Sequence, residues 1–183
     1  MITEIKIGGF GGQGVILSGI IIGKAASIYD DKFATLTQAF GPEARGSACS
    51  AQLLVSDEDV MYPYVTNPDI LVVMSQEAYT KFSPELKEDG LLVYEADLVK
   101  PDDLTGKNAF AIPATRLAEE LGRRMVLNIV MTGFFTAVTD VVSEDSMASA
   151  IKDSVPPGTE SLNMQAFGRG FDFGKSLKNG ITP

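Results

Sequence analysis

The sequence predicts an α/β fold: a single three-layer domain with a mainly parallel sheet, spanning residues 1–183. Short apolar segments alternate along the chain with longer segments of helical period, as in proteins that pack helices on a sheet. The clearest strand, 69–74, is a continuous apolar run, which is typical of a strand covered on both faces. A glycine-rich turn near the N-terminus joins a short strand to an apolar helix, which predicts a strand–turn–helix unit.

The first half of the chain supplies the strand–turn–helix unit and most of the sheet. Residues 5–8 read as a short apolar strand that ends in glycine, and 13–29 repeat apolar residues at helical spacing. Isoleucine and leucine leave this helix little polar face, so we expect it to be mostly buried. Asp30 and Asp31 mark a turn. Strands follow at 33–39, 47–55 and 69–74, separated by a Gly- and Pro-framed loop at 41–46 and an irregular polar stretch at 57–68.

The second half is mainly helical. Glu144 and Asp145 lie in the first turn of one predicted helix, where acidic groups favour the helix dipole. The apolar helix at 126–138 has two interpretations, core burial or a surface covered by partner subunits, with core burial favoured. Glycines at 168, 170 and 174 weaken the helical propensity of the last segment. The predicted helices are 76–82, 114–124, 126–138, 143–152 and 160–175, and the predicted strands are 91–94 and 110–112.

Composition excludes several classes of function. The net charge is −9 and no Lys/Arg run is longer than Arg123–Arg124, so a nucleic-acid partner is not expected. No apolar run reaches membrane-spanning length and no leader precedes the first strand, so we expect a cytoplasmic protein without a membrane contact. The chain has no histidine and one cysteine, Cys49, which we expect to be a buried, unreactive thiol. A disulfide, a Cys/His metal site and an iron–sulfur cluster therefore cannot form within this chain alone.

The glycine turn carries the first candidate site. Gly9, Gly11 and Gly14 have the G-x-G-x-x-G spacing that brings a helix N-terminus close to a phosphate. A dinucleotide site also needs an acidic residue about 20 positions on, at the end of the second strand. Here that strand ends in Gln38, Ala39 and Phe40, which disfavours a classical NAD or FAD site. Two interpretations remain: tight packing of the helix on the strand, or a turn that faces a ligand or another subunit.

A second loop, Gly41-Pro42-Glu43-Ala44-Arg45-Gly46-Ser47, places a carboxylate and a guanidinium two residues apart. The pair could be a local surface ion pair, or Arg45 could clamp a carboxylate, a phosphate or an acidic partner. Because the loop follows the second strand, a parallel sheet would put it at the carboxyl edge beside the glycine turn. Asn128 and Thr132, spaced i to i+4, could line the same edge, although buried packing is the simpler alternative.

With both loops in view, the sequence resembles the gamma subunit of 2-oxoacid:ferredoxin oxidoreductases. Ser47 departs from the pattern, since many relatives look as if they have glycine there, which weakens the case for close backbone approach at that point. The matching blocks cover nearly the whole chain in order: Gly9-Phe10-Gly11-Gly12-Gln13-Gly14, Gly41-Pro42-Glu43-Ala44-Arg45-Gly46, Pro68-Asp69-Ile70-Leu71-Val72, Leu86-Lys87-Glu88-Asp89-Gly90-Leu91-Leu92 and Ile112-Pro113-Ala114.

The resemblance implies a subunit that is not active alone. Such enzymes oxidatively decarboxylate a 2-oxoacid, transfer the acyl group to coenzyme A and pass electrons to ferredoxin. The resemblance implies alpha and beta subunits as partners, with thiamine diphosphate between them and the iron–sulfur clusters held elsewhere than in this chain. A ferredoxin-like delta subunit is an additional candidate partner, and ferredoxin is the acceptor of the complex. The short chain and the sequence Phe40-Gly41-Pro42-Glu43 look most similar to the gamma subunits of 2-oxoglutarate enzymes. Enzymes for pyruvate and for branched-chain 2-oxoacids are the alternatives.

On this interpretation the chain holds no catalytic residue and no metal ligand. The alternative function is a stand-alone dinucleotide- or anion-binding α/β module. The residues expected at the ligand-facing edge are Gly9, Gly11, Gly12, Gln13, Gly14, Glu43, Arg45 and Gly46.

Overall fold

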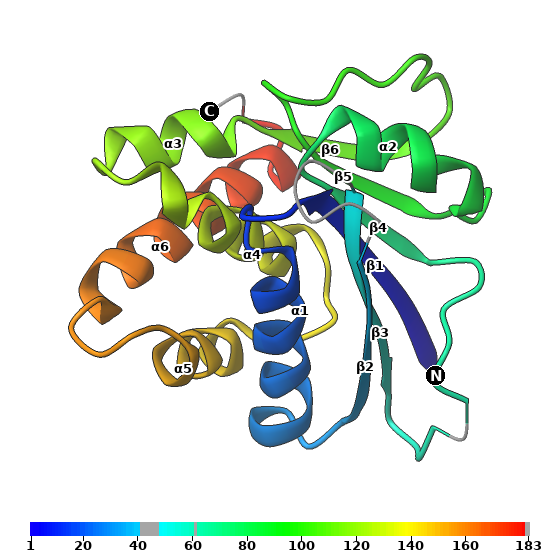
Figure 1. Cartoon of the computed structure of the whole chain (residues 1–183), viewed down its shortest axis with the longest axis horizontal. Coiled ribbons are helices and arrows are strands. Elements are labelled where there is room, and N and C mark those ends of the chain that lie inside the picture. Colours follow the sequence, from blue (N-terminus) through cyan, green and yellow to red (C-terminus); the bar gives the residue numbers. More distant parts are fainter. Residues whose placement is uncertain (41–47, 61, 182–183) are drawn as a thin grey trace.

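The computed structural model describes residues 1–40, 48–60 and 62–181. One six-stranded sheet, in the order β2-β3-β1-β4-β5-β6, carries helices on both faces (Figure 1). The predicted α/β fold and its N-terminal strand–turn–helix are therefore confirmed. The strands are β1 (Ile2–Phe10), β2 (Phe33–Ala39), β3 (Ala48–Ser56), β4 (Ile70–Val73), β5 (Leu91–Glu95) and β6 (Asn108–Ile112).

The sheet is mixed rather than uniformly parallel. β1, β4, β5 and β6 pair in parallel, whereas β3 runs antiparallel between β1 and β2. The second strand thus belongs to an antiparallel pair and does not adjoin β1. The reason is connection length: only residues 40–47 separate β2 from β3, and a parallel crossover needs a dozen or more residues.

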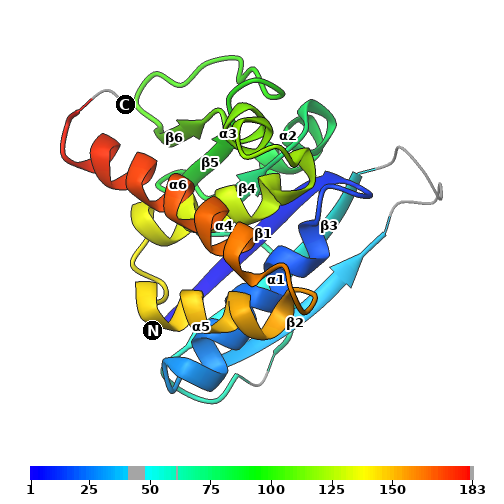
Figure 2. The ribbon, with the colours of Figure 1, turned by 90° about the vertical axis from the view of Figure 1, so that its left-hand side faces the viewer.

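The helices gather mostly on one face of the sheet (Figure 2). The predicted helix at 114–124 ends early, because Gly122 has a φ of +79° and breaks the turn. The helices are α1 (Val15–Lys24), which continues as a π-helical turn η1 (Ala25–Tyr29), α2 (Gln76–Phe82), α3 (Ala114–Glu120), α4 (Leu127–Val138), α5 (Glu144–Ser154) and α6 (Glu160–Lys178), with short 3-10 turns η2 (Ser83–Glu85) and η3 (Arg124–Val126). None of the described helices is long and apolar enough to cross a lipid bilayer.

α4 is the central helix of the core. Every one of its residues is buried, so core burial was the correct interpretation of this apolar segment. α6 crosses it at very short range: a Cβ added to Gly170 would lie 1.9 Å from the carbonyl oxygen of Val130. A Cβ at Gly133 would likewise lie 2.1 Å from the carbonyl oxygen of Phe167. This close backbone contact thus explains the glycine at position 170 of α6, whereas an added Cβ at Gly168 would meet nothing within 4 Å.

The opposite face of the sheet is covered by α2 and the segment after it. Lys6, only 5% exposed, extends from β1 into this layer, pairs with Glu85 and lies 4.8 Å from the centre of the Phe82 ring. Gly8 allows the same ring to approach, because an added Cβ would lie 2.7 Å from Phe82 Cδ2. A buried lysine is tolerated here because it has both a carboxylate and an aromatic face as partners.

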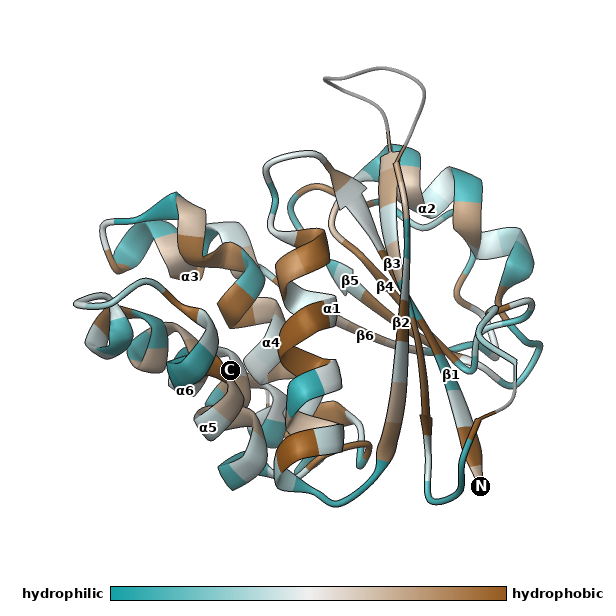
Figure 3. Cartoon of the chain, turned by 60° about the horizontal axis from the view of Figure 1, so that its bottom comes forward, coloured by the Kyte–Doolittle hydropathy of each residue, from teal (hydrophilic) through white to brown (hydrophobic). Residues whose placement is uncertain are grey.

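α1 departs from expectation. Val15, Ser18 and Gly19 face the sheet, but Ile16, Leu17 and Ile20 on the outward side are only partly buried. Figure 3 shows this helix as one of the most hydrophobic elements of the chain, standing at the surface beside β2. The prediction of a mostly buried helix therefore holds for one side only.

Candidate functional site at the glycine turn

The glycine turn crosses from the end of β1 to the start of α1 at the carboxyl edge of the parallel strands. Gly12 and Gly14 have φ values of +93° and +76°, which side chains other than glycine rarely adopt. Gly14 is the N-cap residue, and its carbonyl accepts hydrogen bonds from both the amide and the hydroxyl of Ser18. The turn is therefore held in one conformation by backbone geometry.

Gln13 closes the turn from inside. Its Oε1 accepts a 2.7 Å hydrogen bond from the amide of Phe10, and its Nε2 donates a 2.9 Å bond to the carbonyl of Met74, just beyond β4. The Gln13 amide also donates to the carbonyl of Phe10. The side-chain amide of Gln13 therefore stabilises the turn, and the expectation that Gln13 lies at a ligand-facing edge stays a prediction.

Gly9 and Gly14 are required by packing. A Cβ at Gly9 would lie 2.7 Å from Gln13 Oε1 and 2.8 Å from Val15 Cγ2. A Cβ at Gly14 would lie 2.5 Å from Asn128 Nδ2. The packing interpretation of the glycines is thus correct for these two positions.

Gly11 and Gly12 behave differently. Both are exposed, and a Cβ at either would meet nothing within 4 Å. The amides of Gly12, Gly14 and Val15 donate to no acceptor among the described residues, as is normal in the first turn of a helix. The turn therefore presents unpaired donors and the positive end of α1 to an open surface, which favours an anionic group.

Asn128, in the first turn of α4, lies against this turn. It is 4% exposed, and its side-chain amide makes no hydrogen bond to another described residue. Thr132, one turn further on, is satisfied internally, because its hydroxyl donates to the Asn128 carbonyl. The Asn128 side-chain amide therefore lies beside the donors of the turn, as a polar group that a ligand at this edge would meet.

The second predicted loop, residues 41–47, is not among the residues that the structure describes. Glu43, Arg45, Gly46 and Ser47 lie outside the described residues, so their role stays a prediction. The described residues on either side of this loop lie near the glycine turn: Ala48 pairs with Phe10 at the end of β1, and Ala39 pairs with Ser50. Cys49 pairs with Gly9 in the same register and is buried, and burial raises the pKa of its thiol, as expected of an unreactive cysteine.

The geometry does not support a classical dinucleotide site. In such a site the second strand lies beside the first and ends in a carboxylate. Here β3 separates β2 from β1, and β2 ends in Gln38 and Ala39.

Sequence reasoning missed Glu95, a fully buried carboxylate at the end of β5. Its oxygens accept hydrogen bonds from the amides of Leu98 and Thr115, at 2.7 and 3.2 Å, and so connect the segment after β5 to the first turn of α3. Burial raises the pKa of Glu95, with a smaller contribution from Asp97 in the same direction. An acidic residue ending an otherwise apolar strand was the only signal available in the sequence.

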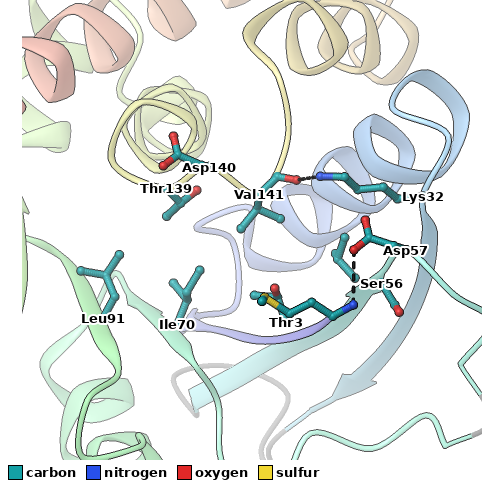
Figure 4. Close-up of a pocket in the computed structure, with 11 residues that line it drawn as sticks. Thr3, Lys32, Ser56, Asp57, Ile70, Leu91, Thr139, Asp140 and Val141 are labelled. Atoms are coloured by element: carbon teal, nitrogen blue, oxygen red, sulfur yellow. Dashed lines mark hydrogen bonds and ion pairs between the residues drawn. The ribbon is translucent and has the colours of Figure 1, made fainter.

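A separate cavity lies at the opposite edge of the sheet. A hollow of about 380 Å³ opens at the amino edge, beside the first residues of β4 and β5, Ile70 and Leu91 (Figure 4). Lys32 Nζ donates to the carbonyl of Val141 there, and the N-terminal amine lies 3.3 Å from Asp57. These cations are already partnered, and no cluster of potential metal ligands occurs in the described parts of the chain. We assign this cavity no function.

Sequence comparison with known proteins identifies a family and several similar proteins. The sequence model of the family described as "Pyruvate ferredoxin/flavodoxin oxidoreductase" matches residues 4–173. The chain is 47% identical over 180 residues to "2-oxoglutarate synthase subunit KorC" of Methanocaldococcus jannaschii, covering 97% of this chain and 96% of that protein.

Solved structures agree on the fold. The gamma subunit of a keto/oxoacid ferredoxin oxidoreductase from Geobacter sulfurreducens aligns with a TM-score of 0.82 and 38% identity, over 96% of this chain and 99% of that one. A 2-oxoglutarate:ferredoxin oxidoreductase from Magnetococcus marinus, solved with 2-oxoglutarate, coenzyme A and succinyl-CoA bound, aligns with a TM-score of 0.87 and 24% identity, over 96% of this chain and 31% of that one. The chain therefore belongs to the pyruvate ferredoxin/flavodoxin oxidoreductase family, and its predicted resemblance to the gamma subunits of that family is confirmed.

Proposed function

We propose that this chain is the gamma subunit of a 2-oxoglutarate:ferredoxin oxidoreductase and that its glycine turn faces coenzyme A in the assembled enzyme. The observation that supports the second part is the position of the buried Asn128 side chain against a turn whose amides donate to no acceptor among the described residues. Coenzyme A is an anion with several phosphate oxygens, which suit amide donors and a helix N-terminus.

The residues of the turn divide into two groups. Gly9, Gln13 and Gly14 hold its shape, whereas Gly11 and Gly12 leave room for a ligand to approach the backbone. We infer that Asn128 bonds to the ligand, and that Glu43, Arg45 and Gly46 complete the edge from the neighbouring loop. Coenzyme A supplies the thiol that receives the acyl group, and this chain contributes only binding and orientation.

The remaining chemistry needs other chains. With one cysteine and no histidine, this sequence lacks ligands for an iron–sulfur cluster. We infer that thiamine diphosphate lies between alpha and beta subunits and that a ferredoxin-like delta subunit holds the clusters that reduce ferredoxin. The complex is then a cytoplasmic enzyme in which residues 1–183 form one gamma-type domain.

2-Oxoglutarate is the preferred substrate assignment because a relative of that name is 47% identical across nearly the full length of both chains. Substrate choice should nevertheless depend mainly on the alpha and beta subunits. Pyruvate and branched-chain 2-oxoacids are the alternatives for the test.

The test is purification of the native complex through a tag on this chain, followed by assay with three 2-oxoacids. We expect co-purification of the larger subunits and coenzyme A-dependent reduction of ferredoxin with 2-oxoglutarate, and little with pyruvate or 2-oxoisovalerate. Recovery of this chain alone, with saturable binding of NAD or FAD, would instead support a stand-alone binding module. Activity confined to pyruvate would overturn the substrate assignment.

A further inference from the structure

The outward side of α1 is unusually apolar for a surface helix. Between Val15 and Ile28 the residues that are not buried are Ile16, Leu17, Ile20, Gly23, Lys24, Ser27 and Ile28, so Lys24 is their only charged member. Ile28 is 59% exposed. A helix side with three isoleucines, a leucine and one charge is normally covered by other elements, whereas this one stands at the surface (Figure 3).

β2, beside it, is an unprotected edge strand. Its seven residues, Phe33-Ala-Thr-Leu-Thr-Gln-Ala39, contain no charge and no proline, and they pair with β3 in an unbroken register. On its other side, no strand among the described residues pairs with it. Exposed edges are usually blunted by charges, proline, bulges or short length, and none of these occurs in β2.

The two elements form one continuous surface. α1 packs closely on β2, since a Cβ added to Gly19 would lie 3.1 Å from Leu36 Cδ1. Phe33, 47% exposed, extends the apolar character to the start of the strand. The surface begins at Gly14, the N-cap of α1, and is therefore continuous with the glycine turn. We call this area, the outward side of α1 with the free edge of β2, the α1–β2 surface.

We propose that the α1–β2 surface is where another subunit of the same enzyme docks, placing an uncharged extended segment beside β2 and apolar side chains against α1. This inference rests on the proposed function. In the aligned Magnetococcus protein the region equivalent to this chain is 31% of a longer polypeptide, and we infer that larger subunits of the same enzyme are the favoured occupant of this surface. A second copy is the weaker occupant, because each copy carries a net charge of −9 and two copies repel.

The first test places a charge in the centre of the surface. Ile20→Glu should weaken association with the larger subunits about 30- to 100-fold, measured by titrating the tagged full-length chain against them, since an unpaired charge buried in an interface is costly. Ile181→Glu, the same change at a residue 60% exposed near the C-terminus, should leave association unchanged. If Ile20→Glu does not fold, Ile28→Glu in the exposed end of the same surface replaces it.

The second test examines the strand edge directly by hydrogen–deuterium exchange in the free chain and in the complex. We expect amides of Phe33–Ala39 to gain protection only in the complex. Wild-type assembly with neither protection of β2 nor an effect of the glutamate variants would overturn this inference and leave the proposed function standing. Failure of the wild-type chain to assemble at all would count against the proposed function itself. A dimer of this chain that Ile20→Glu dissociates would overturn the choice of occupant.

Discussion

Asn128 fills the space that a side chain at Gly14 would occupy: a Cβ built on Gly14 would lie 2.5 Å from Asn128 Nδ2 and 2.8 Å from Asn128 Cβ. Two residues 114 positions apart in the sequence thus fix each other, because the glycine makes room for the asparagine and the asparagine covers the start of α1. The contact joins the N-terminus of α4 to the N-terminus of α1 at one edge of the sheet.

Replacement of Gly14 should therefore be costly to the fold. Gly14→Ala combines a φ of +76° with a clash against Asn128 Cβ, which belongs to the rigid part of that side chain. We expect a loss of about 2–4 kcal/mol in the free energy of unfolding, measured by urea titration. Gly11→Ala is the matched control, because its Cβ meets nothing within 4 Å, and it should cost less than about 1 kcal/mol. Equal losses for the two variants would contradict this account.

Asn128→Ala should separate ligand binding from stability. The amide has no described partner, so its removal should leave the free energy of unfolding within about 1 kcal/mol of wild type. In the assembled enzyme the KM for coenzyme A should rise about tenfold with little change in kcat, because binding is lost without loss of chemistry. A large loss of stability with an unchanged KM would show that the amide serves the fold instead.

Local patterns in the sequence were sufficient for the individual elements. The strand at Phe33–Ala39 and the helix at Gln76–Phe82 have the predicted bounds, since period and punctuation are properties of neighbouring residues. The order of the strands in the sheet could not be predicted in the same way. The position of β3 between β2 and β1 depends on pairing between distant segments of the chain. Because of this position, β2 is not adjacent to β1, the strand that leads into the glycine turn.

The candidate site was predictable only in part. The glycine spacing predicted a turn, but it does not distinguish Gly14, where an added Cβ would clash with Asn128, from Gly11, where it would meet nothing within 4 Å. The amide of Gln13 looked available for a ligand until its two bonds to Phe10 and Met74 were seen. Which polar groups remain unpaired is decided by the whole fold and not by the local sequence.

The buried carboxyl of Glu95 should make stability depend on pH. Its pKa is raised in the folded state, so the folded protein holds this proton more tightly than the unfolded chain does. Its contribution is therefore fully present below the unfolded pKa, near 4.5, and is lost as pH rises through the folded pKa. The free energy of unfolding of wild type minus that of Glu95→Gln should fall as pH rises from about 4.5 towards 7, measured by urea titration. A difference that stays constant over this window would rule out the buried carboxyl as its source.

The crossing of α4 and α6 offers a test within a single helix. Gly170 and Gly168 are both helical, yet a Cβ at Gly170 would lie 1.9 Å from the Val130 carbonyl, whereas one at Gly168 would meet nothing within 4 Å. Gly168→Ala should therefore stabilise the protein by about 0.5–1 kcal/mol through helix propensity alone. Gly170→Ala gains the same propensity but must force the two helices apart, and we expect a net loss of about 3 kcal/mol or more. Thermal unfolding of the two variants under identical conditions measures the contrast, and a stabilising Gly170→Ala would mean that the helices do not cross this closely.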